Sequence, residues 1–120
     1  MPNNSELVKS IKTDFKRMHE IAKELVAVAI EKDAAYGSSW AARGGQGAFF
    51  QGVVRKWDRL ENQLSKVGYD MFDLSVAEDT SESFDETLRD LINYSLLVLE
   101  KREALRAATI RPPTDGVSSR

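Results

Sequence analysis

"FFQGVVRKWDRLENQLSKV", residues 49–67, carries apolar side chains at alternating steps of three and four positions. The series consists of Phe50, Val53, Trp57, Leu60, Leu64 and Val67. An α-helix turns once in about 3.6 residues, so this series forms a stripe along one side of a helix. Such a stripe is typical of the seam of a helix packed in a bundle. We therefore predict a helix from about Gly47 to Val67, ended by Gly68.

A second helical pattern precedes this segment. Apolar residues recur at three- and four-residue steps from Ser5, which suits the N-cap position, to about Tyr36. The stretch "ELVAVAI", residues 24–30, is apolar nearly all round. This composition predicts that the end of the helix is deeply buried.

A third helical pattern follows it. Ser83 and Glu86 have the spacing of a capping box, and we predict a helix from Ser83 to about Arg106. Its stretch "LINYSLLVL", residues 91–99, is apolar on most faces and indicates core. Residues 68–80 between the two helices have mixed character and are expected to form a connector that includes a short helix.

These patterns predict an all-α fold, a bundle of three to four helices per chain. Residues 1–107 are expected to form a single all-α domain, and residues 108–120, with two prolines and no apolar period, a disordered tail. The apolar segments offer more surface than three helices easily cover, and a helix from a second copy would cover the rest. We therefore expect the bundle to be completed by oligomerisation, as a homodimer or homotetramer.

The composition of the chain limits the classes of function and of metal site that it can have. The chain has 120 residues, which suits one domain, and a formal net charge of −2, which points to no nucleic-acid partner. It has no cysteine and one histidine, His19, so thiolate and multi-histidine metal sites within one chain are excluded. No apolar run is long enough to span a membrane, and a cytoplasmic protein is expected. Any metal must be held by oxygen, which favours Mg²⁺ or Mn²⁺.

Two acidic pairs are candidates for such a metal. Asp58 and Glu61 are three residues apart on the central helix, and Glu86 and Asp90 are four apart on the next, where Asn93 continues the face. Antiparallel packing of these helices would gather four carboxylates, which repel one another unless a cation neutralises them. The alternative is that the pairs are solvated: Asp58 neighbours Lys56 and Arg59, and Glu86 serves only the capping box.

The interruption "YGSSWAARGGQGAFF", residues 36–50, is a candidate ligand-binding loop. Its glycines, Gly45 among them, let the backbone approach a ligand, and Arg43 can pair with phosphate. Aromatic residues such as Tyr36, Trp40 and Phe49 can stack on a base. The alternative is a loop whose aromatic side chains cover the end of the bundle. The basic residues Arg55, Lys56 and Arg59 either neutralise the acidic pair or reach a phosphate chain.

Taken together, these features resemble the all-α nucleoside triphosphate pyrophosphohydrolases of the MazG type. That family carries an E-x-x-E motif on one helix and E-x-x-D on the next, and "DRLE" and "ETLRDLINYSLLVLE" are similar to them, with 24 residues between Glu61 and Glu86. The stretches "KDAAYGSSWAARGGQGAFF" and "RKWDRLENQLSK" further resemble small phage-encoded relatives, including MazZ-like (d)GTP diphosphohydrolases. Two departures stand out: Asp58 replaces Glu, and the second motif is one residue too long, with Thr87 three residues before Asp90.

The resemblance implies Mg²⁺-dependent hydrolysis of a (d)NTP, with dGTP or another purine nucleotide as substrate, to the monophosphate and pyrophosphate. It implies Asp58, Glu61, Glu86 and Asp90 as metal ligands, with Glu61 also as the catalytic base. Phage-encoded relatives act in deoxynucleotide metabolism, so the host cytoplasm is the implied location. The expected substrate-binding residues are Trp40, Arg43, Gly45, Phe49, Lys56, Arg59 and Asn93. The competing interpretation is a non-catalytic helical module that binds a nucleotide or another protein.

Overall fold

The structure is a computed structural model that describes residues 3–73 and 83–110, and it is all-α within them. The elements, in chain order, are α1 (Asn4–Ser10), α2 (Phe15–Tyr36), η1 (Ser39–Ala41), α3 (Gly44–Gly47), η2 (Ala48–Val54), α4 (Arg55–Ser65) and α5 (Phe84–Ile110). The predicted fold class is confirmed. The predicted connector lies partly outside the described residues, as does most of the predicted C-terminal tail.

The first predicted helix is two helices, and the prediction of one continuous helix was wrong. α1 begins after Asn3, whose side chain accepts a hydrogen bond from the N–H of Glu6, so Asn3 and not Ser5 is the N-cap. After a break, α2 begins behind a second N-cap, Asp14, which accepts from the N–H of Arg17 at 3.1 Å. Aspartate at an N-cap satisfies a backbone donor that has no partner inside the helix, which favours a new start here.

The central helix forms as predicted but begins earlier and contains an irregular turn. α3, η2 and α4 follow one another without a gap, and η2 is wound as a π-helix, which is rare and often found at functional sites. The predicted stop is confirmed: Gly68 has φ of 63°, and the N–H of Tyr69 bonds back to the carbonyl of Leu64 at 2.9 Å. A hydrogen bond from a residue beyond the helix to a carbonyl of its last turn is the usual end of a helix that stops at a glycine in the left-handed conformation.

The predicted capping residue of the last helix is also confirmed. The Ser83 hydroxyl accepts a hydrogen bond from the N–H of Glu86 at 3.1 Å, and α5 follows. α5 continues to Ile110, past the predicted end near Arg106 and into the residues that we assigned to the tail.

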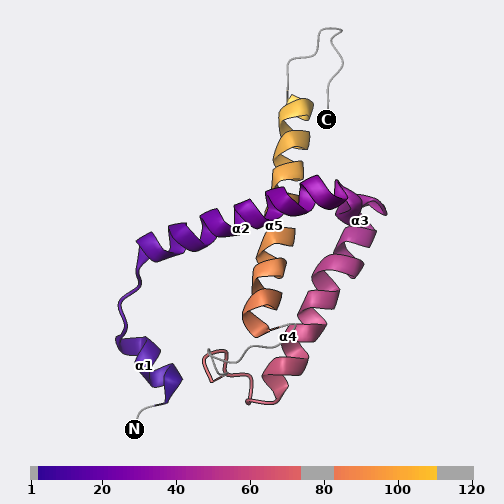
Figure 1. The fold of residues 1–120 in the computed structure, drawn as a ribbon. Helices are drawn as coiled ribbons and strands as arrows, with labels where there is room; N and C mark the ends of the chain where they lie inside the picture. The colour runs from indigo at the N-terminus through magenta and orange to yellow at the C-terminus, as the bar shows by residue number, and fades with distance from the viewer. Residues whose placement is uncertain (1–2, 74–82, 111–120) are drawn as a thin grey trace, which may run out of the picture.

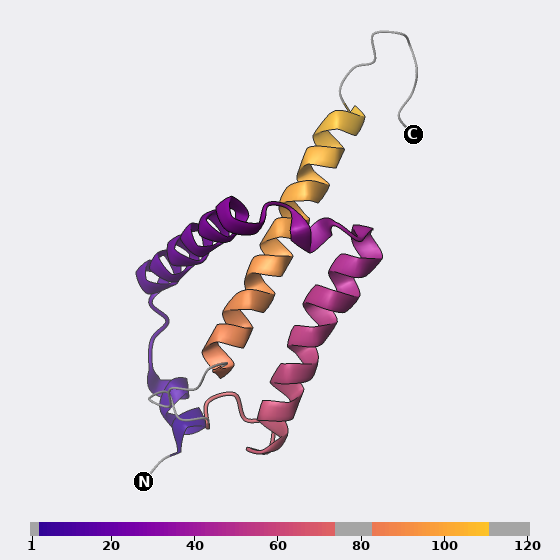
Figure 2. The same cartoon turned by 45° about the vertical axis from the view of Figure 1, so that its right-hand side comes forward.

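α4 and α5 lie side by side and run in opposite directions, and α2 crosses α5 (Figures 1 and 2). The C-terminal part of α5 extends beyond the other helices. α1 lies near the end of α4, where the Ser5 hydroxyl donates to the carboxylate of Asp70 at 2.6 to 2.7 Å. The segment that joins α2 to α4 stands at the opposite end, so α2, α4 and α5 meet there from three directions.

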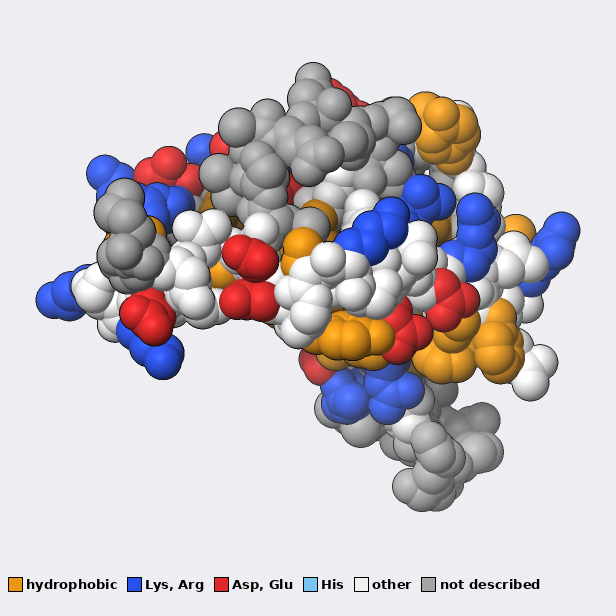
Figure 3. Space-filling model, turned by 90° about the horizontal axis from the view of Figure 1, so that it is seen from below, with side chains coloured by type: hydrophobic (Ala, Val, Ile, Leu, Met, Phe, Trp, Pro, Cys, Tyr) orange, Lys and Arg blue, Asp and Glu red, His pale blue; other side chains and the backbone are white. Residues whose placement is uncertain are grey.

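Few hydrophobic side chains are fully buried within the described residues: Leu25, Ala48 and Leu60. The prediction that residues 24–30 are deeply buried was wrong for this single chain, because among residues 3–73 and 83–110 it is mainly α5 that packs against α2, and Val26, Val28 and Ile30 are exposed. Phe50 and Trp57 of the predicted seam are exposed as well. Hydrophobic side chains also reach the face seen from below (Figure 3). The radius of gyration is 18.7 Å, against about 14 Å expected for a compact domain of this length.

Candidate functional site

A cavity of about 370 Å³ lies where α2, the η1 segment, η2, α4 and α5 meet. This volume is within the range of small-molecule sites. Its lining combines cationic groups, two carboxylates, aromatic rings and amides. The lining residues are Ala29, Lys32, Asp33, Tyr36, Gly37, Ser39, Trp40, Gln51, Gly52, Arg55, Lys56, Asp90, Asn93, Tyr94 and Leu97.

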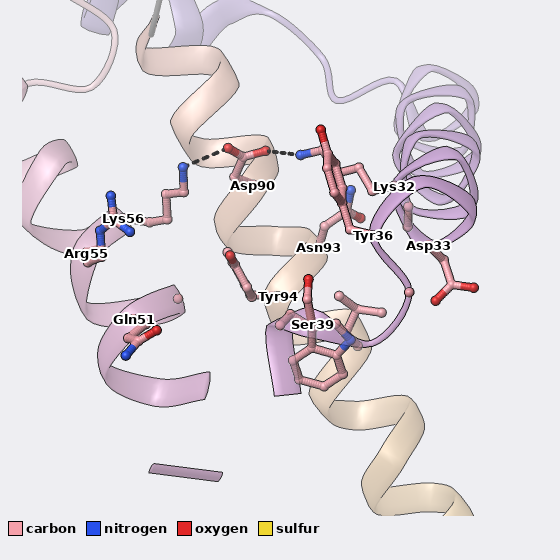
Figure 4. A pocket seen from close by; sticks show the side chains of 15 residues that line it. Lys32, Asp33, Tyr36, Ser39, Gln51, Arg55, Lys56, Asp90, Asn93 and Tyr94 are labelled. Carbon is pink, nitrogen blue, oxygen red and sulfur yellow. Dashed lines mark hydrogen bonds and ion pairs between the residues drawn. The ribbon is translucent and has the colours of Figure 1, made fainter. Parts of the chain in front are cut away.

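Asp90 of α5 lies between two lysines that come from different helices (Figure 4). One carboxylate oxygen is 2.9 Å from Nζ of Lys56 on α4, and the other is 3.3 Å from Nζ of Lys32 on α2. The carboxylate therefore ties three helices together at one point. Asp33, the second carboxylate of the lining, points away from Asp90.

The environment keeps Asp90 ionised. Its side chain is only 24% exposed, and this partial burial raises the pKa of the carboxyl group. Hydrogen bonding to Lys56 and the positive charges of both lysines act in the opposite direction and prevail. The net result is a pKa below the ordinary aspartate value, so Asp90 is an anion at neutral pH.

This pKa predicts how stability depends on pH. A carboxyl group whose pKa is lowered by folding stabilises the fold above its unfolded pKa, about 3.9, and loses that contribution as the pH falls through the folded value. We expect the free energy of unfolding of wild type to exceed that of Asp90→Asn at about pH 6, and the difference to shrink on acidification. Urea unfolding of both proteins at equal concentration measures it. A difference independent of pH would show that the charge of Asp90 does not act in folding.

Asn93, one turn beyond Asp90, presents an acceptor without a partner. The residue is 8% exposed, and its Nδ2 donates to the backbone carbonyl of Leu25 at 3.0 Å. Because a carbonyl only accepts, this bond fixes which end of the amide is which. Oδ1 of Asn93 is buried and has no hydrogen-bond partner within residues 3–73 and 83–110, a state that is costly unless a ligand or water donates to it.

The structure brings four predicted site residues to the cavity: Trp40, Lys56, Asp90 and Asn93. The other predicted substrate-binding residues, Arg43, Gly45, Phe49 and Arg59, do not line it. Asp58, Glu61 and Glu86 are exposed and lie outside the lining as well. Within residues 3–73 and 83–110, no three acidic or histidine side chains are grouped closely enough to hold a metal ion.

The position of Thr87 explains why the second acidic motif does not assemble. Thr87 is fully buried, while Glu86 beside it is exposed. The inward position three residues before Asp90 therefore carries a hydroxyl, which donates to the carbonyl of Ser83 at 3.0 Å. Adjacent helix positions are about 100° apart, so Glu86 cannot replace an inward carboxylate by a small adjustment.

Sequence reasoning missed several residues of the lining, namely Lys32, Asp33, Gln51 and Tyr94. Lys32 and Asp33 of α2 were missed because residues 36–50 alone were treated as the candidate ligand-binding loop. A signal was available: both residues lie between an apolar run and the glycine that ends α2. Charged residues at the end of a helix, next to a glycine-rich segment, are well placed to face a ligand.

The close approach of η2 to α5 leads to a prediction for Gly52. A Cβ on Gly52 would lie 2.8 Å from Cε1 of Tyr94, so Gly52→Ala must displace this ring of the cavity wall. Overpacking lowers the free energy of unfolding by about 1–3 kcal/mol, and the higher helix propensity of alanine raises it by about 1 kcal/mol. We expect a net loss of about 1 kcal/mol in thermal or urea unfolding. Gly45→Ala is the control, because its Cβ meets nothing within 4 Å and should stabilise α3 slightly. Equal effects of the two would contradict the close approach.

Comparison with known proteins links the chain to a bacteriophage. It is 26% identical over 99 residues to the Gene 30 protein of Bacillus phage SP01. The match covers 72% of this chain and 44% of the phage protein, so the chain spans less than half of that relative. No family model matches the chain, and no solved structure matches it significantly. In the described part of the chain, every helix is too short or too polar to cross a membrane.

Proposed function

We propose that the cavity binds a nucleoside triphosphate and that the chain hydrolyses it to the monophosphate and pyrophosphate. The observation that carries the proposal is the composition of the lining: cations and amide side chains share one cavity with three aromatic rings. A nucleotide needs these features together, because it joins a polyanion to a flat base with polar edges. Hydrolysis is the activity that the resemblance to the MazG-type enzymes implies.

The phosphate end would face the cationic side of the cavity. Lys32, Lys56 and Arg55 are three cations in the lining against the carboxylates Asp33 and Asp90. Lysine acts as a mobile point charge towards phosphate, and arginine can hold two phosphate oxygens at once. This excess of positive charge favours an anionic ligand even though the whole chain carries a formal charge of −2.

The base end would face the aromatic rings and Asn93. Rings of Tyr36, Trp40 and Tyr94 line the same cavity and offer stacking surfaces. Asn93 also lines the cavity, and its amide would hydrogen-bond with a polar edge of the base. Adenine, guanine and cytosine carry an exocyclic amino group, and the preference for dGTP among them rests on the phage-type resemblance alone.

The four-carboxylate metal set implied by the resemblance does not assemble within the described residues of one chain. Mg²⁺ nevertheless binds many nucleotide sites through one or two protein carboxylates, with phosphate oxygens completing its shell. Asp90 is the cavity residue that would hold such an ion, whose charge would neutralise the phosphates and polarise them for attack. Mg²⁺ or Mn²⁺ is therefore part of the proposal as an ion that arrives with the nucleotide.

A second candidate function is nucleotide binding without cleavage. It is favoured by the buried Thr87, which occupies the inward position where the resembled motif has glutamate. A site that lacks this carboxylate can still hold phosphates through its lysines. This candidate predicts the same ligand but no product.

We further propose that the chain acts as a homo-oligomer in the cytoplasm of a phage host. The phage relative supports the location, and the exposed apolar faces support association. On α5, Ile92, Leu96 and Leu99 are 40%, 40% and 57% exposed at three- and four-residue steps. We call these three residues the α5 stripe. A stripe of this spacing on a helix is suited to pack against another helix.

The test of the enzymatic proposal is a product assay. The protein is incubated with each common NTP and dNTP, with Mg²⁺ and then Mn²⁺, and the nucleotides are separated by chromatography. Monophosphate and pyrophosphate from one or a few substrates is the expected result. Diphosphate and phosphate would contradict attack at the α-phosphorus. Absence of product together with nucleotide binding, measured by calorimetry, would favour the second candidate.

A further inference from the structure

The two lysines that hold Asp90 are arranged as an anion site. Their ammonium groups approach one carboxylate from α2 and α4, at 3.3 Å and 2.9 Å. The Lys56 side chain is 20% exposed, so much of its charge is withdrawn from water, whereas Lys32 is 56% exposed and open to solvent. Arg55 stands on the same wall of the cavity as Lys56.

A carboxylate and a phosphate group make the same kind of contact with ammonium groups. Both accept charge-assisted hydrogen bonds through oxygen, but a phosphate group offers more oxygens and up to two charges. Lys32 and Lys56 therefore carry donors that a phosphate group would accept in the same way as the carboxylate of Asp90 does.

We propose that Lys32 and Lys56 form a phosphate-binding site for which the carboxylate of Asp90 competes, so that a polyphosphate binds by taking over the lysines from Asp90. The inference deepens the proposed function and rests on it for the natural ligand, a nucleoside triphosphate. Asp90 then has two roles in succession. Before binding it forms an ion pair with each lysine, and when phosphate arrives it is released towards the cavity.

The charge state of the competitor supports this exchange. Partial burial raises the pKa of Asp90, but the lysines lower it further, so the competing carboxylate is fully ionised at neutral pH. A competitor at full charge weakens phosphate binding at every pH where a nucleotide site normally operates. Its removal should therefore strengthen binding of a bare polyphosphate.

Calorimetric titration with inorganic tripolyphosphate, in the presence of a metal chelator and at low ionic strength, tests the exchange. We expect Asp90→Asn to bind tripolyphosphate at least tenfold more tightly than wild type. Asp33→Asn is the matched control, since it removes the same charge from the same lining but from a side chain that points away from Asp90. Its gain in affinity should stay within about threefold, because at low ionic strength its lost charge acts on the ligand only through the general field of the lining.

Equal or weaker binding by Asp90→Asn, with an unchanged circular dichroism spectrum, would overturn the proposal. Equal gains in Asp90→Asn and Asp33→Asn would also overturn it, because they would show a general charge effect. If Asp90→Asn does not fold, Lys32→Gln decides, since Lys32 is largely exposed and its loss leaves the fold intact. Lys32→Gln should bind tripolyphosphate at least tenfold more weakly, and unchanged affinity would contradict the site.

The result is separable from the proposed function. If wild type turns over a nucleotide but Asp90→Asn does not bind tripolyphosphate more tightly, the proposed hydrolase is supported and the proposed exchange is refuted. If Asp90→Asn binds tripolyphosphate more tightly but wild type turns over no nucleotide, the phosphate-binding site is supported and the proposed hydrolase is refuted.

Discussion

Turnover of the nucleotide substrate is expected to fall at least a hundredfold in Asp90→Asn, while the helical circular dichroism spectrum stays that of wild type. Asp90 is a carboxylate of the cavity lining, and under the proposed function it is the group that would hold Mg²⁺ against the phosphates. Loss of one well-placed charged group from a catalytic site typically costs about two to three orders of magnitude. Asparagine keeps the shape of the side chain, so a folded variant is expected.

Steady-state kinetics on the substrate identified in the product assay measures this loss, and the two kinetic constants should move differently. A lower kcat with an equal or lower KM is expected, because the same substitution frees Lys32 and Lys56 for phosphate. Glu86→Gln is the matched control: Glu86 is exposed and lies outside the cavity lining, so its turnover should stay within about threefold of wild type. Normal turnover by Asp90→Asn would refute the site. A large loss of turnover in Glu86→Gln would support the predicted set of four carboxylate metal ligands.

The second large effect is expected at the α5 stripe. Leu96→Glu should convert the proposed homo-oligomer to a monomer, because a two-fold axis places the substituted residue of both copies in one interface. Burying an unpaired charge costs several kcal/mol, and about 3 kcal/mol already weakens association more than a hundredfold. Size-exclusion chromatography with light scattering, over a dilution series, measures the mass of wild type and variant.

Leu105→Glu serves as the control for added charge on the same helix. Leu105 is 67% exposed and lies nine positions beyond Leu96, on the opposite side of α5. It should leave the mass unchanged. A wild type that is monomeric at all concentrations would contradict the oligomer, and dissociation of Leu105→Glu but not Leu96→Glu would place the interface elsewhere.

The helices could be predicted from the sequence wherever local chemistry decides. The apolar period predicted the central helix, and the cap at Ser83 and the stop at Gly68 depend on short-range bonds that the sequence displays. The break before α2 was also local, since Asp14 is a common N-cap residue, but an apolar period that continued through Ile11 and Phe15 masked it. The π-helical turn and the close approach of Gly52 to Tyr94 were not predicted, because spacing along one helix does not show how that helix packs against another.

The candidate site was predicted only in part, for a related reason. Spacing along one helix identifies residues on a face, and it placed Asp90 and Asn93 together correctly. It does not say which face of a second helix is opposite, and so Glu61 was paired with Asp90 when the structure pairs Lys56 instead. The contact of Lys32 with Asp90 depends on the crossing of α2 over α5, which links residues 58 positions apart in the chain.

The π-helical turn η2 also makes the length of this segment part of the site. A π-turn holds one residue more than the α-helical turn it replaces, so it marks a place where a single residue can be removed and leave a regular helix. Removal of one residue within Ala48–Val54 would therefore keep the orientation of the segment before it, whereas removal of one residue from the regular turns of α4 would rotate that segment by about 100° relative to Asp90. Trp40 would then leave the wall that it shares with Asp90. We therefore expect a one-residue deletion in α4 to disturb the cavity more than a one-residue deletion in η2.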